Sequence, residues 1–213
     1  YERIGEWASG GIGPHDLKRL ADGRIVVANG GIQTDPNDRT KLNIPDMRPN
    51  LSLLSIAGQM VEQVELDPDL RQNSIRHLAL LGDGVAFAMQ WEGDPSIAVP
   101  QLGLWMPGRP AQVLSPPQDQ SFAMQGYAGS IAATADRIAL TSPKGGALMI
   151  FDAAGGYVAT HRRADLSGVA SNADGFIATD GQGAVWSCDD SGLATLNTGK
   201  TLWDNHLVRV AAG

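Results

Sequence analysis

The sequence has a single cysteine, Cys188, and this scarcity excludes several kinds of site. One cysteine cannot form an intrachain disulfide, attach a haem through a Cys-x-x-Cys-His motif or build a cysteine-rich zinc site. No stretch approaches the roughly 18 apolar residues that a membrane span requires, so we expect no membrane span. Charged residues make up only 18% of the chain and hydrophobic residues 43%, which indicates an ordered globular protein.

Positive charge is also scarce. The chain has 16 lysines and arginines against 23 aspartates and glutamates, which gives a net charge of -7. A protein that binds nucleic acid broadly needs a basic surface that displaces counterions from phosphates. We therefore expect no nucleic-acid partner, and an anionic membrane surface is disfavoured for the same reason.

Glycine is abundant, with 26 residues, and the stretch Gly10–Gly31 shows how glycines flank a β-branched run. The β-branched run Ile25–Ala28 directly follows Asp22-Gly23, and this pattern predicts a hairpin with a two-residue Asp-Gly turn at positive φ angles. No long helical periodicity occurs anywhere in the chain. The sequence therefore predicts an all-β fold.

Four segments repeat the same order of features: a strand, an Asp-centred turn, a second strand, a variable loop, a third strand, a Gly turn and a fourth strand. The first turns are centred on Asp22, Asp83, Asp136 and Asp174, and the last two of these are 38 residues apart. That interval is close to the roughly 40–45 residues of a four-stranded propeller blade. We predict one partial β-propeller over residues 1–213, with blades at about 12–66, 74–115, 128–163 and 167–197.

Two segments lie outside these blades. Arg3–Trp7 resembles the outermost strand of a further blade, and residues 202–210 resemble a closing innermost strand. Four blades with a single strand at each end predict an interrupted ring whose exposed edges pair with missing N-terminal blades or with another chain. The alternative is a four-bladed ring that these two strands close.

Several motifs occur in the order typical of one bacterial family: GGIGPHDL, DGRIVVANGG, KLNIPDMRPNL, NSIRHLAL, TSPKGG and WDNHL. Over about Gly10–Leu207 the chain resembles the domain-of-unknown-function family fifteen-thirteen, whose members are exported propellers related to the YVTN type. The resemblance implies a seven-bladed ring of which this chain is the C-terminal part, and a periplasmic location reached through a twin-arginine signal. The family offers no established activity to carry over.

Three of the four histidines are predicted to begin innermost strands, which would bring His15, His77 and His206 to one rim of the central channel. Imidazoles there could converge on a metal ion, the one cofactor the sequence suggests, or on an anionic or carboxylate ligand. Arg76 and Asp16 stand beside them and could supply charge. The alternative is that the histidines bond to neighbouring blades and only stabilise the ring.

Loops between second and third strands are expected at the same rim. The longest, between residues 29 and 50, is a candidate binding surface. The predicted metal ligands are His15, His77 and His206, and the predicted ligand-binding residues are His15, Asn29, Lys41, Asn43, Arg76, His77 and Gln90.

Three functional classes fit this sequence. The first is a periplasmic binding or accessory module that holds a small polar or metal-bearing ligand. The second is an enzyme of the lactonase or quinoprotein kind, in which His15 or His77 would be a base or metal ligand. The third is a scaffold that binds a protein partner. We assign no catalytic residue, and whether the protein is an enzyme stays open.

Overall fold

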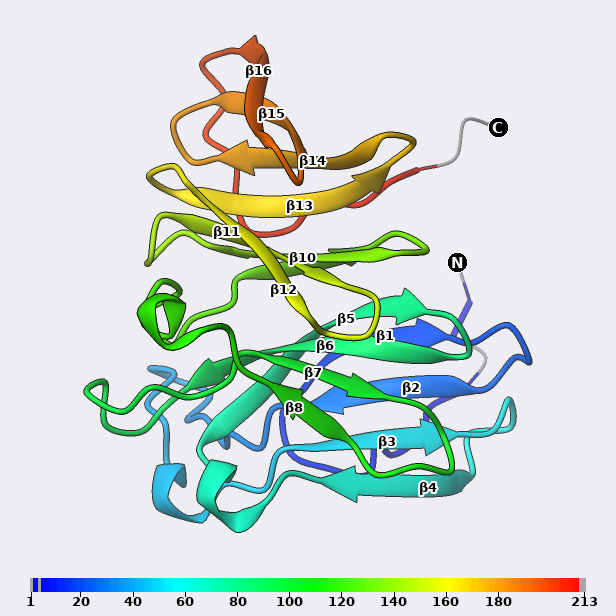
Figure 1. Ribbon diagram of the computed structural model, residues 1–213. Coiled ribbons are helices and arrows are strands. Elements are labelled where there is room, and N and C mark those ends of the chain that lie inside the picture. Colours follow the sequence, from blue (N-terminus) through cyan, green and yellow to red (C-terminus); the bar gives the residue numbers. More distant parts are fainter. Residues whose placement is uncertain (1, 4, 211–213) are drawn as a thin grey trace.

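The computed structural model describes residues 2–3 and 5–210 and forms four antiparallel sheets of four strands each (Figure 1). In every sheet the strands pair in chain order, as in a propeller blade. Blade 1 contains β1 (Pro14–Arg19), β2 (Ile25–Asn29), β3 (Asn50–Leu54) and β4 (Met60–Glu65). Blade 2 contains β5 (Asn73–Leu81), β6 (Gly84–Trp91), β7 (Leu102–Trp105) and β8 (Gln112–Leu114). Blade 3 contains β9 (Ser130–Ala133), β10 (Arg137–Ser142), β11 (Ala147–Asp152) and β12 (Tyr157–Arg162). Blade 4 contains β13 (Leu166–Asn172), β14 (Gly175–Asp180), β15 (Ala184–Asp189) and β16 (Gly192–Thr198).

In the part of the chain that the structure describes, the helical content is limited to three 3₁₀ turns in the connections: η1 (Ile44–Asp46), η2 (Pro68–Leu70) and η3 (Gln118–Gln120). Within the residues described, no helix is long and apolar enough to cross a membrane. These findings confirm the predicted all-β propeller class.

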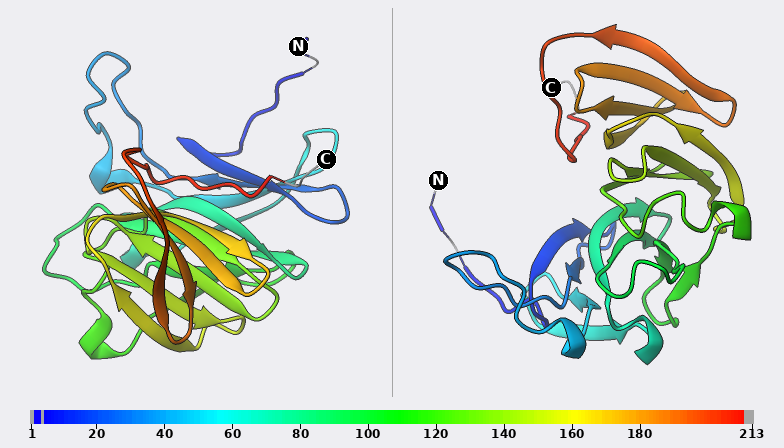
Figure 2. Two further views of the ribbon diagram at one scale, coloured as in Figure 1. Left: turned by 90° about the horizontal axis from the view of Figure 1, so that it is seen from above. Right: turned by 90° about the vertical axis from the view of Figure 1, so that its left-hand side faces the viewer.

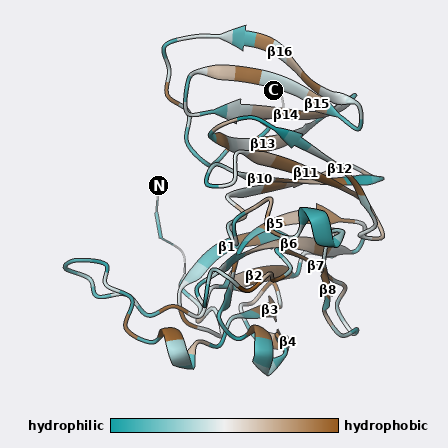
Figure 3. Cartoon of the chain, turned by 60° about the vertical axis from the view of Figure 1, so that its left-hand side comes forward, coloured by the Kyte–Doolittle hydropathy of each residue, from teal (hydrophilic) through white to brown (hydrophobic). Residues whose placement is uncertain are grey.

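The blades follow one another around an arc that leaves one side open (Figure 2). Each blade packs its face against the next through a separate apolar cluster. Phe87 of β6 is fully buried between blades 1 and 2, Leu140 of β10 between blades 2 and 3, and Leu148 of β11 between blades 3 and 4. Figure 3 shows hydrophobic colouring on the central strands, which supply these clusters, and mostly hydrophilic colouring on β1.

The first tight turn in blade 1 differs from the predicted type. Leu20 N–H bonds to Arg24 O at 2.8 Å and Gly23 N–H to Leu20 O at 3.0 Å, so the hairpin loop has three residues. Only Gly23 has a positive φ, of 91°, which is the arrangement of a type I turn followed by a glycine bulge. The Ser55–Gln59 loop has the same pair of bonds, with Gly58 at φ 76°. The predicted two-residue Asp-Gly turn is therefore wrong in length but right in place.

The two rims of the arc differ in construction. The turn face carries the hairpins that join first to second and third to fourth strands, among them residues 20–24 and 106–111. The loop face carries the connections between second and third strands and between blades, including the long loop 30–49. The inner strands begin at the loop face, so the start of each inner strand lies beside these loops.

Neither end segment is a strand of any of the four sheets. Arg3 and residues 5–7 form no strand, and Ile4 lies outside the described residues. Residues 202–210 also form no strand, although they pass close to blade 4, where Leu207 packs against Gly168 of β13. The expectation of a hydrogen-bonded strand at each end is corrected to an extended segment.

Candidate functional site

Three histidine rings converge at the inner side of the arc. The ring centroids of His15 and His77 are 4.7 Å apart with the planes at 85°, and those of His77 and His206 are 4.8 Å apart with the planes at 64°. His77 is 7% exposed, whereas His15 and His206 are exposed on either side of it. The three line a cavity of about 210 Å³ together with Asp16, Lys18 and Ser130. The structure therefore brings together the histidines that the sequence singled out.

The strand register shows that the histidines are not in equivalent positions. In β1 the pairing skips His15, with Pro14 opposite Asn29 and Asp16 opposite Ala28. In β5 the pairing skips Arg76, with Ile75 opposite Met89 and His77 opposite Ala88. His15 thus corresponds to Arg76, and Asp16 corresponds to His77. The shared starting position expected for the histidines is corrected by one residue, and each bulge lets two successive side chains reach the channel region.

His206 arrives from the other end of the chain. After β16, residues 199–210 return to the inner side of the arc (Figure 2). Asn205 donates a hydrogen bond through Nδ2 to the hydroxyl of Tyr127 at 3.3 Å, and Leu207 lies against Gly168. A Cβ on Gly168 would stand 3.0 Å from the Cβ of Leu207, so the glycine makes room for this segment. These contacts place the His206 ring beside His77.

The surroundings of His77 and His15 favour the neutral form of both rings. The pKa of His77 is lowered to about 3, mainly by burial and in smaller part by repulsion between a protonated His77 and the neighbouring His15, His206, Arg76 and Lys18. The pKa of His15 is lowered as well, first by burial and then by the charge on Arg76. His77 is therefore uncharged at neutral pH, with one ring nitrogen able to accept and the other able to donate a hydrogen bond.

Arg76 is held next to the histidines with few partners of its own. The side chain is 18% exposed, and its Nε is buried without a hydrogen-bond partner in the described residues. One terminal nitrogen lies 3.7 Å from Oε1 of Glu92. The other oxygen of Glu92 accepts from Nζ of Lys41 at 2.5 Å, which ties the long loop to blade 2. Burial lowers the pKa of Arg76, and the charge on Glu92 opposes this.

Sequence reasoning missed Glu92, Tyr127 and Asn205. Glu92 directly follows β6, as Gly30 directly follows β2, so both residues lie at the loop face. This equivalent position in the blade repeat could have identified Glu92 from the sequence. No local pattern marks Tyr127 and Asn205, because their contact joins residues 78 positions apart.

The other predicted binding residues have structural partners away from the histidines. Asn29 is fully buried and donates to Ser9 O, to Asn50 and to Ser52 on the opposite side of blade 1. Asn43 closes the long loop through bonds to Gln33 N–H and Gly31 O. Gln90 donates to Ala128 O at 3.2 Å between blades 2 and 3. Of the predicted set, the structure gathers His15, His77, His206 and Arg76, with Lys41 linked to them through Glu92.

The donor atoms are not arranged around a metal position. No group of three or more histidine, cysteine, aspartate or glutamate side chains in the described part of the chain is placed to hold a metal ion. The three rings instead meet edge to face. Metal binding by His15, His77 and His206 stays a prediction that requires the rings to turn.

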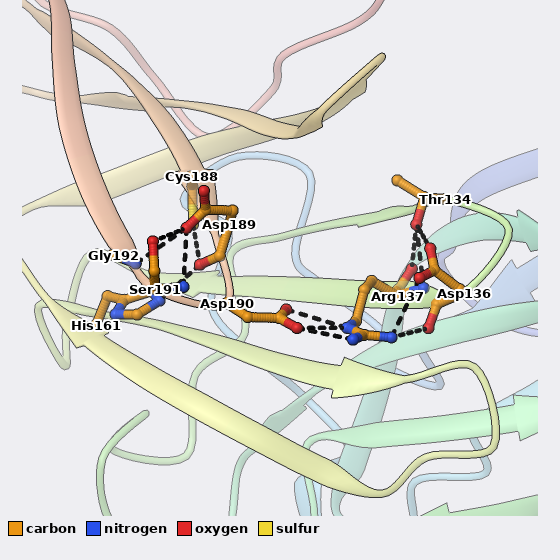
Figure 4. Close-up of polar contacts among 9 residues, drawn as sticks. All are labelled: Thr134, Asp136, Arg137, His161, Cys188, Asp189, Asp190, Ser191 and Gly192. Atoms are coloured by element: carbon orange, nitrogen blue, oxygen red, sulfur yellow. Dashed lines mark hydrogen bonds and ion pairs between the residues drawn. The ribbon is translucent and has the colours of Figure 1, made fainter.

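A second polar contact lies between blades, on the turn face. Arg137 of β10 makes a bidentate ion pair with Asp190 in the β15–β16 turn, with a closest distance of 2.7 Å (Figure 4). Nε2 of His161 lies 2.9 Å from Asp189 O in the same turn. Figure 4 shows these side chains directed at each other across blades 3 and 4, and every charge in the pair is satisfied. This contact stabilises the packing of neighbouring blades and offers no free group to a ligand.

A comparison with known families decides the membership of the chain. The model of the family "Protein of unknown function (DUF1513)" matches residues 1–210. The chain belongs to this family. The family resemblance predicted from the motifs is thereby confirmed. No curated protein matches the chain.

Solved structures resemble this DUF1513 chain at low sequence identity, and one of them is described as a β-propeller domain. The computationally designed Ika8 protein superposes with a TM-score of 0.55 at 12% identity, over 81% of this chain and 44% of that chain. The β-propeller domain of Cps50 (Swd1) from Myceliophteria thermophila gives 0.55 at 14%, over 86% and 58%. Sqt1 from Saccharomyces cerevisiae gives 0.51 at 11%, over 85% and 60%. The chain thus spans less than two thirds of each of these proteins, and the likeness shows the fold alone.

Proposed function

We propose that the protein is a binding module that holds a small organic anion, such as a carboxylate, at the inner end of its loop face. The observation that carries the proposal is the largely buried side chain of Arg76, whose buried Nε has no partner in the described residues, next to His77 in a cluster of three converging imidazoles. A periplasmic location is part of the proposal, and its support is the resemblance to exported propellers.

The charge distribution favours an anion over a cation in this site. Lys18 is paired with Asp16 at 3.1 Å, so Arg76, whose charge lowers the pKa of His77, is the group that attracts a negative ligand. Glu92 neutralises Arg76 only in part, because its nearer contact is to Lys41. A carboxylate could accept from Arg76 and from imidazole N–H groups, and charge-assisted bonds of this kind are the strong ones.

Metal binding is the second candidate, and the ring spacing supports it. Two imidazoles that share one zinc ion through bonds of about 2.1 Å have ring centroids about 5 Å apart. The observed separations of 4.7 and 4.8 Å are close to this value. Turning the rings about their side-chain bonds would have to redirect the nitrogens toward a common point.

Calorimetric titration with citrate, compared with uncharged glycerol, tests the proposal. We expect citrate to bind and Arg76→Gln to weaken binding by about tenfold or more, since a hydrogen bond to a charged group contributes about 1.5–3 kcal/mol. The matched control is Arg19→Gln, an exposed arginine at the turn-face end of β1. If Arg76→Gln does not fold, His15→Gln at an exposed position replaces it.

Two results would overturn the anion proposal. One is citrate binding that is unchanged in Arg76→Gln and His15→Gln. The other is stoichiometric zinc uptake without citrate binding, provided that a His15→Gln/His77→Gln double variant loses the zinc, and this result would establish the metal candidate instead.

A further inference from the structure

A separate cavity of about 510 Å³ lies on the turn face between blades 2 and 3. Its lining is mostly apolar, and blade 2 contributes Leu81, Val85, Leu104, Trp105, Met106 and Arg109. The volume falls within the roughly 300–1,000 Å³ typical of small-molecule sites. The histidine site lies toward the opposite rim and shares no lining residue with this cavity.

Small residues on blade 3 leave this space open. Ala135 in the β9–β10 turn and Ala153 in the β11–β12 turn face the cavity, and their methyl groups do not reach across to blade 2. Leu81 and Leu104 pack on one side against the apolar cluster between the two blades. The cavity is therefore the unfilled outer end of that cluster, and an apolar molecule would complete the packing.

The hairpin that forms one wall is fixed by hydrogen bonds. The indole N–H of Trp105 donates to Arg109 O at 3.0 Å, and Arg109 N–H donates to Met106 O at 3.1 Å. Gly108 N–H donates to a carboxylate oxygen of Glu62 at 2.8 Å, which ties the hairpin to blade 1. These bonds hold the backbone of Arg109 at the rim of the cavity and engage the carboxylate of Glu62.

The guanidinium of Arg109 makes no hydrogen bond or ion pair with any residue that the structure describes, and it is exposed at the edge of the apolar space. We propose that this cavity binds a small amphipathic carboxylate. The apolar body lies against Leu104, Trp105 and Met106, and the carboxylate pairs with Arg109. A few placed polar groups around an apolar lining are typical of sites that fix the orientation of one molecule. The pairing of one positive group with one apolar space selects an acid with a single charged end.

Octanoate and octan-1-ol, which share the apolar chain and differ in charge, are the probes. By calorimetry with the purified protein we expect octanoate to bind, and Arg109→Gln to weaken octanoate by about threefold to fivefold while leaving octan-1-ol unchanged, because an exposed ion pair contributes up to about 1 kcal/mol. Ala153→Phe should fill the space and abolish binding of both probes, with Ala135→Leu as a second filling variant. Arg24→Gln is the matched control, because Arg24 is also on the turn face and pairs with Asp22 outside the cavity.

Three results would overturn the proposal. They are no octanoate binding at millimolar concentration, equal octanoate binding in Arg109→Gln and the unaltered protein, and binding that persists in both filling variants. Citrate binding at the loop face is measured separately, so a negative result at one site does not refute the proposal for the other.

Discussion

The buried imidazole of His77 makes a prediction about stability and pH that can be worked out in detail. Its pKa in the folded protein is about 3, against 6.5 for an unperturbed histidine. Below pH 6.5 the unfolded chain therefore binds a proton that the folded chain excludes, and stability falls as the pH is lowered from 6.5 toward 3. Above pH 6.5 neither state is protonated, and His77 contributes no slope.

The size of the effect follows from the width of this window. Each pH unit inside the window corresponds to about 1.4 kcal/mol, so lowering the pH from about 7.5 to about 5 removes roughly 2 kcal/mol through His77. Other ionisable groups also titrate over this range, but most of them do so equally in a His77→Gln variant. The difference between the two proteins isolates the contribution of His77.

Urea unfolding of both proteins at about pH 5 and about pH 7.5 is the assay. We expect the difference in unfolding free energy between the unaltered protein and His77→Gln to shift by about 2 kcal/mol in favour of the variant at the lower pH. His161→Gln, at the outer edge of blade 3, is the control. An unchanged difference at the two pH values, or an NMR titration of His77 with a midpoint near 6.5, would refute the reasoning.

Three further outcomes are expected. Asp16→Ala should lower the unfolding free energy by about 1–3 kcal/mol, because Oδ2 of Asp16 accepts a hydrogen bond from the backbone N–H of Leu78 at 2.9 Å across blades 1 and 2. Asp16→Asn should lower it less. Equal urea midpoints for Asp16→Ala and the unaltered protein would contradict this. Cys188 is 3% exposed and burial raises its pKa to about 12, so a thiol reagent should label it only after unfolding, and rapid labelling of the folded protein would speak against that burial. Lys41→Ala should speed amide hydrogen exchange in the long loop, because it removes the ion pair between Lys41 and Glu92. The melting temperature should hardly change, because the lysine side chain is half exposed and such pairs contribute little to stability. Unchanged exchange would show that the pair does not restrain the loop.

The fold could be predicted because its repeating unit is local. A β-branched strand, a turn marked by Asp or Gly and a second strand occur within each blade, and hairpins form between chain neighbours. The predictions that were wrong concern details that depend on contacts beyond the neighbouring residues in the sequence. The sequence marks a turn at Asp22-Gly23, but whether its loop has two or three residues depends on which backbone groups pair across the hairpin.

The sequence was sufficient to predict which histidines form the site, but not how they are arranged. His15 and His77 stand near the starts of inner strands, and this placement is visible in the sequence. The bulges at His15 and Arg76 are not visible, because they depend on how β1 and β5 pair with their neighbours. The partners of Asn29 were also out of reach, since they lie about 20 positions away on both sides of the chain.

The bulges also explain why the polar site lies at blades 1 and 2 rather than around the whole arc. In β1 and β5 a bulge directs two successive polar side chains inward, whereas β9 pairs without interruption and continues from Ser130 into the apolar Ile131. In β13 the interruption falls between Leu166 and Val169, where Gly168 leaves space that the C-terminal segment fills. Blade 4 therefore contributes room rather than a polar group, and that room lets His206 reach His77 from a distant part of the chain.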